Sequence, residues 1–306
     1  MNIRKAGMPA TFTTRFFRHA FLVFALVATA RASALYSQAM ELVAARRYPE
    51  ARDILLQVVA AEPQNAPAWY QLGIIWAKRH DDAAMQEAMK CLARAVDLEP
   101  HNAKYLGDYG GVSLEVAGRT RSITAAFRGR DALEKAVALN PNDLDAREGL
   151  FQYYTRAPFF AGGSSGKAAV ELAEITRLAP DRGTVLAILT KANARDYAGA
   201  FKLCDDVLRR EPSNYTALYQ YGRTASVSGQ NLSRGLECLQ KSLTLKQPGP
   251  AAPTHSNAWY RIGDIQQKLG HKDEARAAYE AALKLDPANR QASTALDKLR
   301  RATAKP

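Results

Sequence analysis

Trp69-Tyr70-Gln71-Leu72-Gly73 recurs near the end of the chain as Trp259-Tyr260-Arg261-Ile262-Gly263. Each copy leads into a helical pattern of small and large residues that ends in proline. The positions that continue the second copy are Ala275, Tyr279, Ala282 and Pro287, and those that continue the first are Ala88, Leu92, Ala95 and Pro100. A repeat of roughly 34 residues predicts one structural unit stacked many times. The question for this chain therefore becomes which partner it binds, more than which reaction it performs.

Further copies lie between these two. Leu106-Gly107-Asp108-Tyr109-Gly110 and Leu218-Tyr219-Gln220-Tyr221-Gly222 open two of them, and three weaker copies run over 35–63, 150–180 and 184–212. We therefore predict seven helix pairs, near 35–65, 66–102, 103–143, 144–180, 181–214, 215–247 and 256–288. A capping helix over 289–301, with Ala292, Ala295, Leu296 and Leu299 on one face, and a tail over 302–306 complete the chain.

The spacing within a copy has a physical explanation. A large residue and a small one four positions later share one face of a first helix, and the small residue lets a second helix cross closely. The proline ends the pair because it cannot continue a helix interior. This pattern resembles the tetratricopeptide repeat, W-x2-L-G-x2-Y…A-x3-F…P, most fully from Trp259 to Pro287. The resemblance implies an all-α fold, a right-handed α-solenoid.

The first 34 residues differ from the rest. Arg4, Lys5, Arg15 and Arg18 precede a short apolar run over 21–27. Ala32-Ser33-Ala34 offers a cleavage site after Ala34, with Ala28-Thr29-Ala30 as a second choice. These are the parts of a secretory signal peptide, so we expect a periplasmic or secreted protein. The apolar run is short for a membrane span. An uncleaved N-terminal membrane anchor is the alternative.

Charge narrows the choice of partner. The 306-residue chain has a formal charge of +12, and from residue 35 on it holds 37 Lys or Arg against 30 Asp or Glu, a charge of +7. Such a surface favours acidic partners or anionic surfaces. Nucleic acid is not expected, because the basic residues are interspersed with acidic ones. Cys91, Cys204 and Cys238 fall at packing positions of second helices, and we expect buried free thiols.

The segment from Ala161 to Ala168 nearly matches a phosphate-binding loop, but Ala161 replaces the first glycine and Ala168 the hydroxyl that would hold magnesium. We interpret it as an insertion between two helices, with Pro158 ending the first. Phe159 and Phe160 within it either pack against the repeats or stay exposed as a contact with a partner, and packing is the interpretation that we favour. The run from Asp145 to Ala168 is also similar to a segment of exported bacterial tetratricopeptide proteins with no settled activity.

No pattern of catalysis or metal binding is evident. The histidines after residue 34 are dispersed over predicted turns, and no His-x3-His, paired Cys or acidic cluster has metal-ligand spacing. We therefore predict a non-enzymatic protein without a cofactor or metal.

The resemblance implies that the first helices line a concave face. The positions next to the packing residues, which we expect to face a protein or peptide partner, are Tyr70, Gln71, Asp108, Gln152, Arg156, Tyr219, Gln220, Arg223, Tyr260, Arg261 and Asp264. Tyrosine beside a polar residue suits an extended peptide, because the ring supplies contact area at low entropic cost. Arg223, Arg261 and Lys268 would attract an acidic segment. An adaptor for a protein in the cell envelope is the predicted function, and the alternative is an accessory component of an envelope transport system that captures a small solute.

Overall fold

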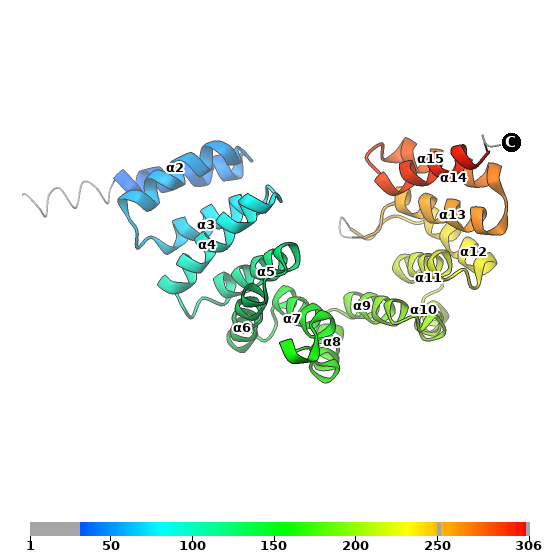
Figure 1. Cartoon of the computed structure of the whole chain (residues 1–306), viewed down its shortest axis with the longest axis horizontal. Coiled ribbons are helices and arrows are strands. Elements are labelled where there is room, and N and C mark those ends of the chain that lie inside the picture. The colour runs from blue at the N-terminus through cyan, green and yellow to red at the C-terminus, as the bar shows by residue number, and fades with distance from the viewer. Residues whose placement is uncertain (1–30, 250–251, 304–306) are drawn as a thin grey trace, which may run out of the picture. The chain divides into compact units, whose positions relative to one another are not determined.

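The computed structural model describes residues 31–249 and 252–303. All regular structure within these ranges is helical (Figure 1). A helix over residues 31–44 comes first. It is followed by α2 (Tyr48–Ala61), α3 (Ala66–Ala77), α4 (Asp82–Leu98), α5 (Ala103–Thr120), α6 (Ile123–Leu139), α7 (Leu144–Arg156), the short 3-10 helix η1 (Phe159–Ala161) and α8 (Ser165–Leu178). The chain continues with α9 (Pro180–Asn193), α10 (Tyr197–Arg210), α11 (Tyr215–Ser228), α12 (Leu232–Leu243), α13 (His255–Leu269), α14 (Lys272–Leu285) and α15 (Arg290–Thr303).

Helices pack in consecutive pairs, so the predicted all-α fold of the tetratricopeptide type is confirmed. The closest packing joins α3 to α4, α5 to α6, α11 to α12 and α13 to α14. The chain forms two compact units, residues 1–171 and 172–306, and each is described by itself below.

The turns between pairs use one recurring device. In Glu62-Pro63-Gln64-Asn65 the Asn65 side chain accepts a hydrogen bond from the Ala68 amide at 3.0 Å and donates one to Glu62 at 2.9 Å. Asn102 and Asn214 do the same after Pro100 and Pro212. The asparagine therefore caps the next first helix, while the proline before it has no amide to donate. Pro180 differs, because it is the first residue of α9.

Close approach within a pair depends on the repeated glycine. A Cβ placed on Gly73 would lie 2.6 Å from Leu92 Cγ, and one on Gly222 would lie 2.2 Å from Leu239 Cγ. Any larger residue would push the two helices of the pair apart. This is the role that the sequence spacing predicts for the small residue.

The hydrophobic cores run along the helix pairs. In the second unit Ile188, Phe201, Leu239 and Ile265 are buried together, with Trp259 packed partly against them. Cys91, Cys204 and Cys238 are buried free thiols, as predicted, and burial raises the pKa of each.

The structure describes the C-terminal helix α15 but not residues 1–30 at the N-terminal end. On α15, Ala292, Leu296 and Leu299 are buried, as expected for the face of a capping helix. Most of the predicted signal peptide, residues 1–30, lies outside the described residues, and 31–34 belong to the first helix. Among the described helices, none has the length and apolar character that crossing a membrane requires.

Candidate functional site

The residues predicted to face a partner lie on first helices of both units. Tyr70 and Gln71 are on α3, Asp108 is on α5, and Gln152 and Arg156 are on α7, all in the first unit. The second unit holds Tyr219, Gln220 and Arg223 on α11 and Tyr260, Arg261 and Asp264 on α13.

Tyr70 and Asp108 are engaged with each other across two repeats. The Tyr70 hydroxyl donates to Asp108 Oδ2 at 2.7 Å, and its ring stacks on Tyr105 with 4.5 Å between centroids. The ammonium of Lys104 lies 5.4 Å from the Tyr70 ring and 3.6 Å from Asp108. Burial first, and then the hydrogen bond to Asp108, raise the pKa of Tyr70 to about 12. With 6% of its surface exposed, Tyr70 mainly joins neighbouring repeats.

Gln152 and Arg156 are exposed on α7, and among the described residues no interaction joins them to Tyr70 or Asp108. They are free to meet a partner. Gln71 is half-buried.

In the second unit, Asp264 lies at the centre of a polar cluster. Ser226 donates to Asp264 Oδ2 at 3.1 Å, the Tyr279 hydroxyl lies 3.1 Å from Oδ1, and Arg261 Nη1 lies 3.4 Å from Oδ2. The side chains of Arg261 and Asp264 are 14% and 22% exposed. We call Ser226, Arg261, Asp264 and Tyr279 the Asp264 cluster. The cluster joins α11, α13 and α14. Within it Arg261 compensates the negative charge of Asp264, and Ser226 and Tyr279 form hydrogen bonds to the same carboxylate.

Two pockets flank the Asp264 cluster. One, of about 440 Å³, is lined by Ser226, Val227, Arg261, Asp264, Gln267 and Lys268 of α11 and α13. The other, of about 420 Å³, lies between α13 and α15 and is lined by Tyr260, Asp264, Gln267, Arg290, Gln291, Thr294, Ala295 and Lys298. The pockets share Asp264 and Gln267 and therefore form one surface along α11, α13 and α15, which we call the basic groove.

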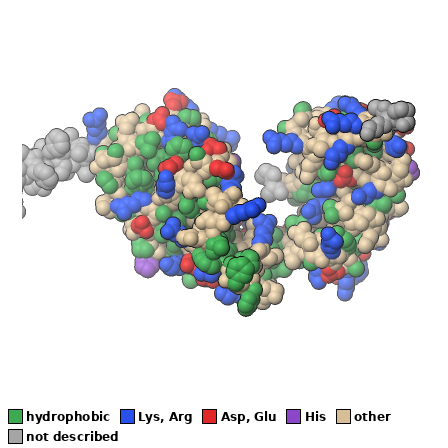
Figure 2. All heavy atoms as spheres, viewed as in Figure 1, with side chains coloured by type: hydrophobic (Ala, Val, Ile, Leu, Met, Phe, Trp, Pro, Cys, Tyr) green, Lys and Arg blue, Asp and Glu red, His purple; other side chains and the backbone are tan. Residues whose placement is uncertain are grey.

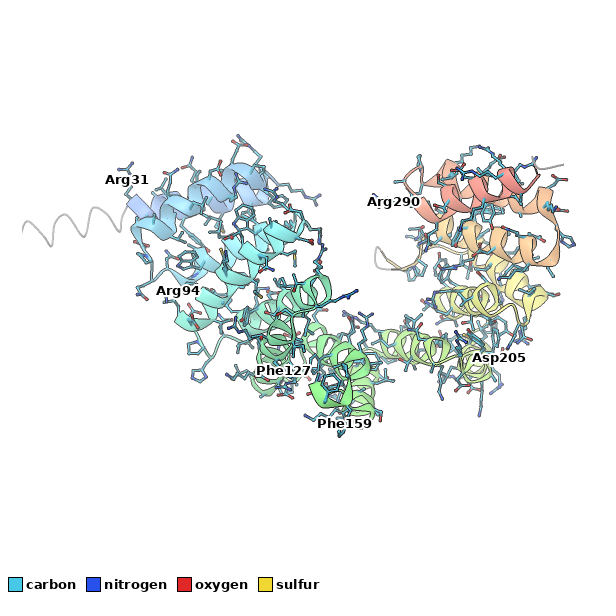
Figure 3. The ribbon with its side chains drawn as sticks, in the orientation of Figure 1. Arg31, Arg94, Phe127, Phe159, Asp205 and Arg290 are labelled. Carbon is cyan, nitrogen blue, oxygen red and sulfur yellow. The ribbon has the colours of Figure 1, made fainter. Side chains whose placement is uncertain are left out.

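The basic groove is lined by more Lys and Arg side chains than acidic ones. Lys268, Arg290 and Lys298 line it and form no ion pair within the described ranges. Asp264 is the acid of both linings, and the Asp264 cluster already occupies it. Figure 3 shows Arg290 projecting from the first turn of α15. The surplus favours a negatively charged ligand.

Arg223 and Arg261 strengthen this inference at the edge of the groove. Burial, together with the positive charge of Arg261, lowers the pKa of Arg223. Nearby, two buried polar atoms, Gln220 Oε1 and Arg261 Nε, have no hydrogen-bond partner among the described residues. A half-buried arginine beside a second arginine favours the approach of an anion, and Asp264 compensates only Arg261. Tyr219 and Gln220, in contrast, are themselves buried, with 6% and 4% exposed, and offer a partner little area.

Sequence reasoning missed Arg290, Lys298 and Gln267 as site residues. Arg290, Thr294 and Lys298 are spaced by four, which places them on one face of α15 opposite its buried alanine and leucines. This spacing is the feature of the sequence that could have indicated these residues. On its own it predicts only that they lie on the solvent-facing side of the capping helix.

The loop after α7 corrects one expectation. Phe159 and Phe160, which we expected to pack against the repeats, are 92% and 81% exposed. The reason is the turn itself: Pro158 ends α7, and Gly162, with φ of +87°, reverses the chain before either ring can fold back. Figure 3 shows Phe159, the first residue of η1, pointing away from the neighbouring helices.

Metal binding has no visible basis in the part of the chain that the structure describes. No group of three or more His, Cys, Asp or Glu side chains is placed there to hold an ion.

Comparison with known proteins identifies repeat matches in two parts of the chain. Residues 36–103 and 256–289 match models of the tetratricopeptide repeat. A STIP1 homologue from Dictyostelium discoideum is 33% identical over 112 residues, which cover 36% of this chain and 18% of that protein. This chain thus aligns with a small part of that relative's length.

Solved structures support the fold. A tetratricopeptide repeat protein from Parabacteroides merdae superposes with a TM-score of 0.65 at 14% identity, covering 88% of this chain and 98% of that one. PilW, a type IV pilus biogenesis factor, is similar at a TM-score of 0.45 and 16% identity, with 87% of this chain and 98% of that one covered. The chain therefore contains tetratricopeptide repeats over residues 36–103 and 256–289 and shares the fold of a solved tetratricopeptide repeat protein over most of its length.

Proposed function

We propose that this protein is a non-enzymatic adaptor of the cell envelope that binds an acidic segment of a protein partner in the basic groove. Tetratricopeptide repeat proteins bind protein partners, and the finer assignment rests on this chain's own residues. The observation that carries it is the set of unpaired cations Lys268, Arg290 and Lys298 around a carboxylate that is already occupied.

The groove suits an extended acidic peptide for two reasons. Its two pockets follow one another along α11, α13 and α15, so successive side chains of a peptide can each meet a cation. The Tyr260 ring, with Arg261 held 4.8 Å above it, adds apolar contact area beside the charges. The envelope location is supported by the basic and apolar pattern of residues 1–34 alone.

The first experiment measures binding of a fluorescent hexaglutamate peptide to the full chain by anisotropy. We expect the double variant Arg290→Gln with Lys298→Gln to bind about thirtyfold more weakly, because each of the two lost charge contacts is worth about 1 kcal/mol. The matched control is Lys272→Gln with Lys284→Gln, which removes two exposed charges from α14 instead. Tyr219 is left intact, since it packs in the hydrophobic core of the second unit.

The second experiment finds the partner. Cross-linking with mass spectrometry in the native host should place an acidic segment of one envelope protein against residues of α13 and α15. Equal peptide affinity in the groove and control variants would overturn the acidic-ligand assignment, and cross-links that avoid these helices would overturn the groove.

The alternative, capture of a small solute, has one observation in its favour. Each pocket's volume lies within the range of small-molecule sites, about 300–1,000 Å³. A thermal shift with small dicarboxylates that Arg290→Gln with Lys298→Gln abolishes, and no protein cross-link, would favour it over the adaptor.

A further inference from the structure

The segment over residues 157–164, which we call the phenylalanine loop, presents two large apolar side chains to solvent. Phe159 and Phe160 are the most exposed large hydrophobic residues of the described chain. Figure 2 shows hydrophobic side chains gathered over this part of the first unit. Adjacent exposed rings of this kind mark an interaction site.

The loop is held in place by its own hydrogen bonds. Ala161 and Gly163 amides donate to the Pro158 carbonyl at 2.9 and 3.0 Å, and the Ser164 amide donates to the Tyr154 carbonyl at 3.0 Å. The Tyr153 hydroxyl donates to the Ala161 carbonyl from beneath. A Cβ on Gly163 would lie 1.8 Å from the Ala157 carbonyl oxygen, so the turn needs glycine there. The two rings are therefore presented by a rigid turn, and exposing them is a stable property of the fold.

Apolar and basic groups continue from the loop onto α6. The Arg130 guanidinium lies 5.8 Å from the Tyr153 ring and 5.1 Å from the Phe127 ring, which links Phe127 to the base of the loop. Figure 3 shows Phe127 and Phe159 on neighbouring elements of the first unit.

The charge around the loop is positive. Between Glu148 and Glu171 the sequence contains Arg156 and Lys167 and no acidic residue. The nearby acids on α6 are occupied: Asp131 accepts from Arg130 at 2.5 Å, and Glu134 accepts from Tyr154 at 2.5 Å and from Lys167 at 3.5 Å. Arg156, in the last turn of α7 before the loop, is exposed and forms no ion pair within the described residues. The rings are thus flanked by cations without a competing free carboxylate.

We propose that the phenylalanine loop docks this protein on an anionic phospholipid surface. Phe159 and Phe160 enter the boundary between headgroups and acyl chains, while Arg156 and Lys167 meet lipid phosphates. A protruding pair of apolar rings with a basic surround is the arrangement that binds such interfaces, through buried apolar area plus attraction to anionic lipid. Several backbone amides of the turn already donate hydrogen bonds within the loop. The loop therefore offers a bilayer mainly apolar contact, which needs no fixed hydrogen-bond partner in the lipid.

The test uses a local readout, because the apolar residues 21–27 of the full chain could bind lipid themselves. Phe160→Trp places an indole at the exposed position, and vesicles of phosphatidylcholine with about 30% phosphatidylglycerol, made with brominated acyl chains, quench an indole that reaches the acyl region. We expect the emission added by this indole to be quenched. In the control Leu139→Trp, at an exposed position at the far end of α6, we expect no quenching of the added emission.

A second measurement gives the energetics. Sedimentation of the full chain with the same vesicles should show roughly tenfold weaker binding for Phe159→Ser with Phe160→Ser, since two rings leave the interface. Leu139→Ser is the control and should bind as the wild type does. Binding should also fall when salt is raised or when phosphatidylglycerol is left out.

Two results would overturn the proposal. One is equal quenching of the indoles introduced by Phe160→Trp and Leu139→Trp, a readout that does not depend on lipid binding by residues 21–27. The other is loss of a protein cross-link, with vesicle binding unchanged, in Phe159→Ser with Phe160→Ser, which would assign the rings to a protein pocket. Neither result depends on the basic groove, because the two surfaces lie on different helices.

Discussion

Tyr70 was expected to face a partner, and the structure shows a residue that also connects repeats. Its ring stacks on Tyr105 and its hydroxyl reaches Asp108, two helices further along the chain. Tyr279 on α14 makes the corresponding bonds within one helix pair, to Asp264 and Gln267 of α13. Tyrosine at these positions therefore combines packing with a directional bond between neighbouring helices.

The Tyr70 bond predicts a specific response to alkali. The folded pKa of Tyr70 is raised from 10.0 to about 12, so its stabilising contribution is complete below pH 10 and is lost as the pH rises toward 12. Tyr70→Phe should cost about 1–2 kcal/mol at neutral pH, because it leaves Asp108 without this donor. Urea unfolding followed by circular dichroism should show the wild-type and variant stabilities converging between pH 10 and 12. Parallel curves over that range would contradict the assignment.

Within helix α5, two neighbouring glycines have opposite surroundings. A Cβ on Gly110 would lie 2.5 Å from Leu133 Cγ and 3.0 Å from the Gly129 carbonyl oxygen, whereas a Cβ on Gly111 meets nothing within 4 Å. Gly110 is therefore needed where α5 and α6 cross, and Gly111 only adds flexibility to the unfolded chain.

Alanine substitutions test this difference within one helix. Gly110→Ala should destabilise the protein by about 1–3 kcal/mol through overpacking. Gly111→Ala should stabilise it by about 0.5–1 kcal/mol, since alanine favours the helix. Thermal melts of both variants check the signs. A similar shift for the two would mean that the helix crossing is not limited by this contact.

At the scale of the whole molecule, the repeat architecture makes stability local. Each pair of helices contacts mainly its neighbours, so a destabilising substitution in one repeat lowers the stability of that repeat and its neighbours more than that of distant repeats. Trp259, packed partly against the core of the second unit, is the residue that tests this.

Trp259→Ala should loosen the second unit and leave the first intact. Truncating a buried tryptophan costs about 3–5 kcal/mol, and this partly buried one should cost less. Hydrogen exchange measured by mass spectrometry should show faster exchange within residues 172–303 and unchanged exchange within 31–171. Faster exchange in both ranges would show that the two units unfold as one.

Several features could be predicted from the sequence because they are local. The recurrence of Trp69–Gly73 at Trp259–Gly263 indicated paired helices, since helical periodicity and the proline that ends it depend on residues close in the chain. The buried thiols and the buried face of α15 followed from the same periodicity. The Glu-Pro-x-Asn turns were equally local, and only their side-chain bonds had to await the structure.

The tertiary structure alone decided which of these side chains is available to a ligand. Tyr219 and Gln220 carry the predicted pattern but are buried, because packing against adjacent helices covers them. Arg290 and Lys298 enter the basic groove because α15 lies beside α13, a neighbour about thirty residues away in the chain. Phe159 and Phe160 are exposed because the turn at Gly162 directs them outward. The sequence determined the helices and their order through contacts along the chain, whereas the binding surfaces depend on contacts between helices that no local pattern records.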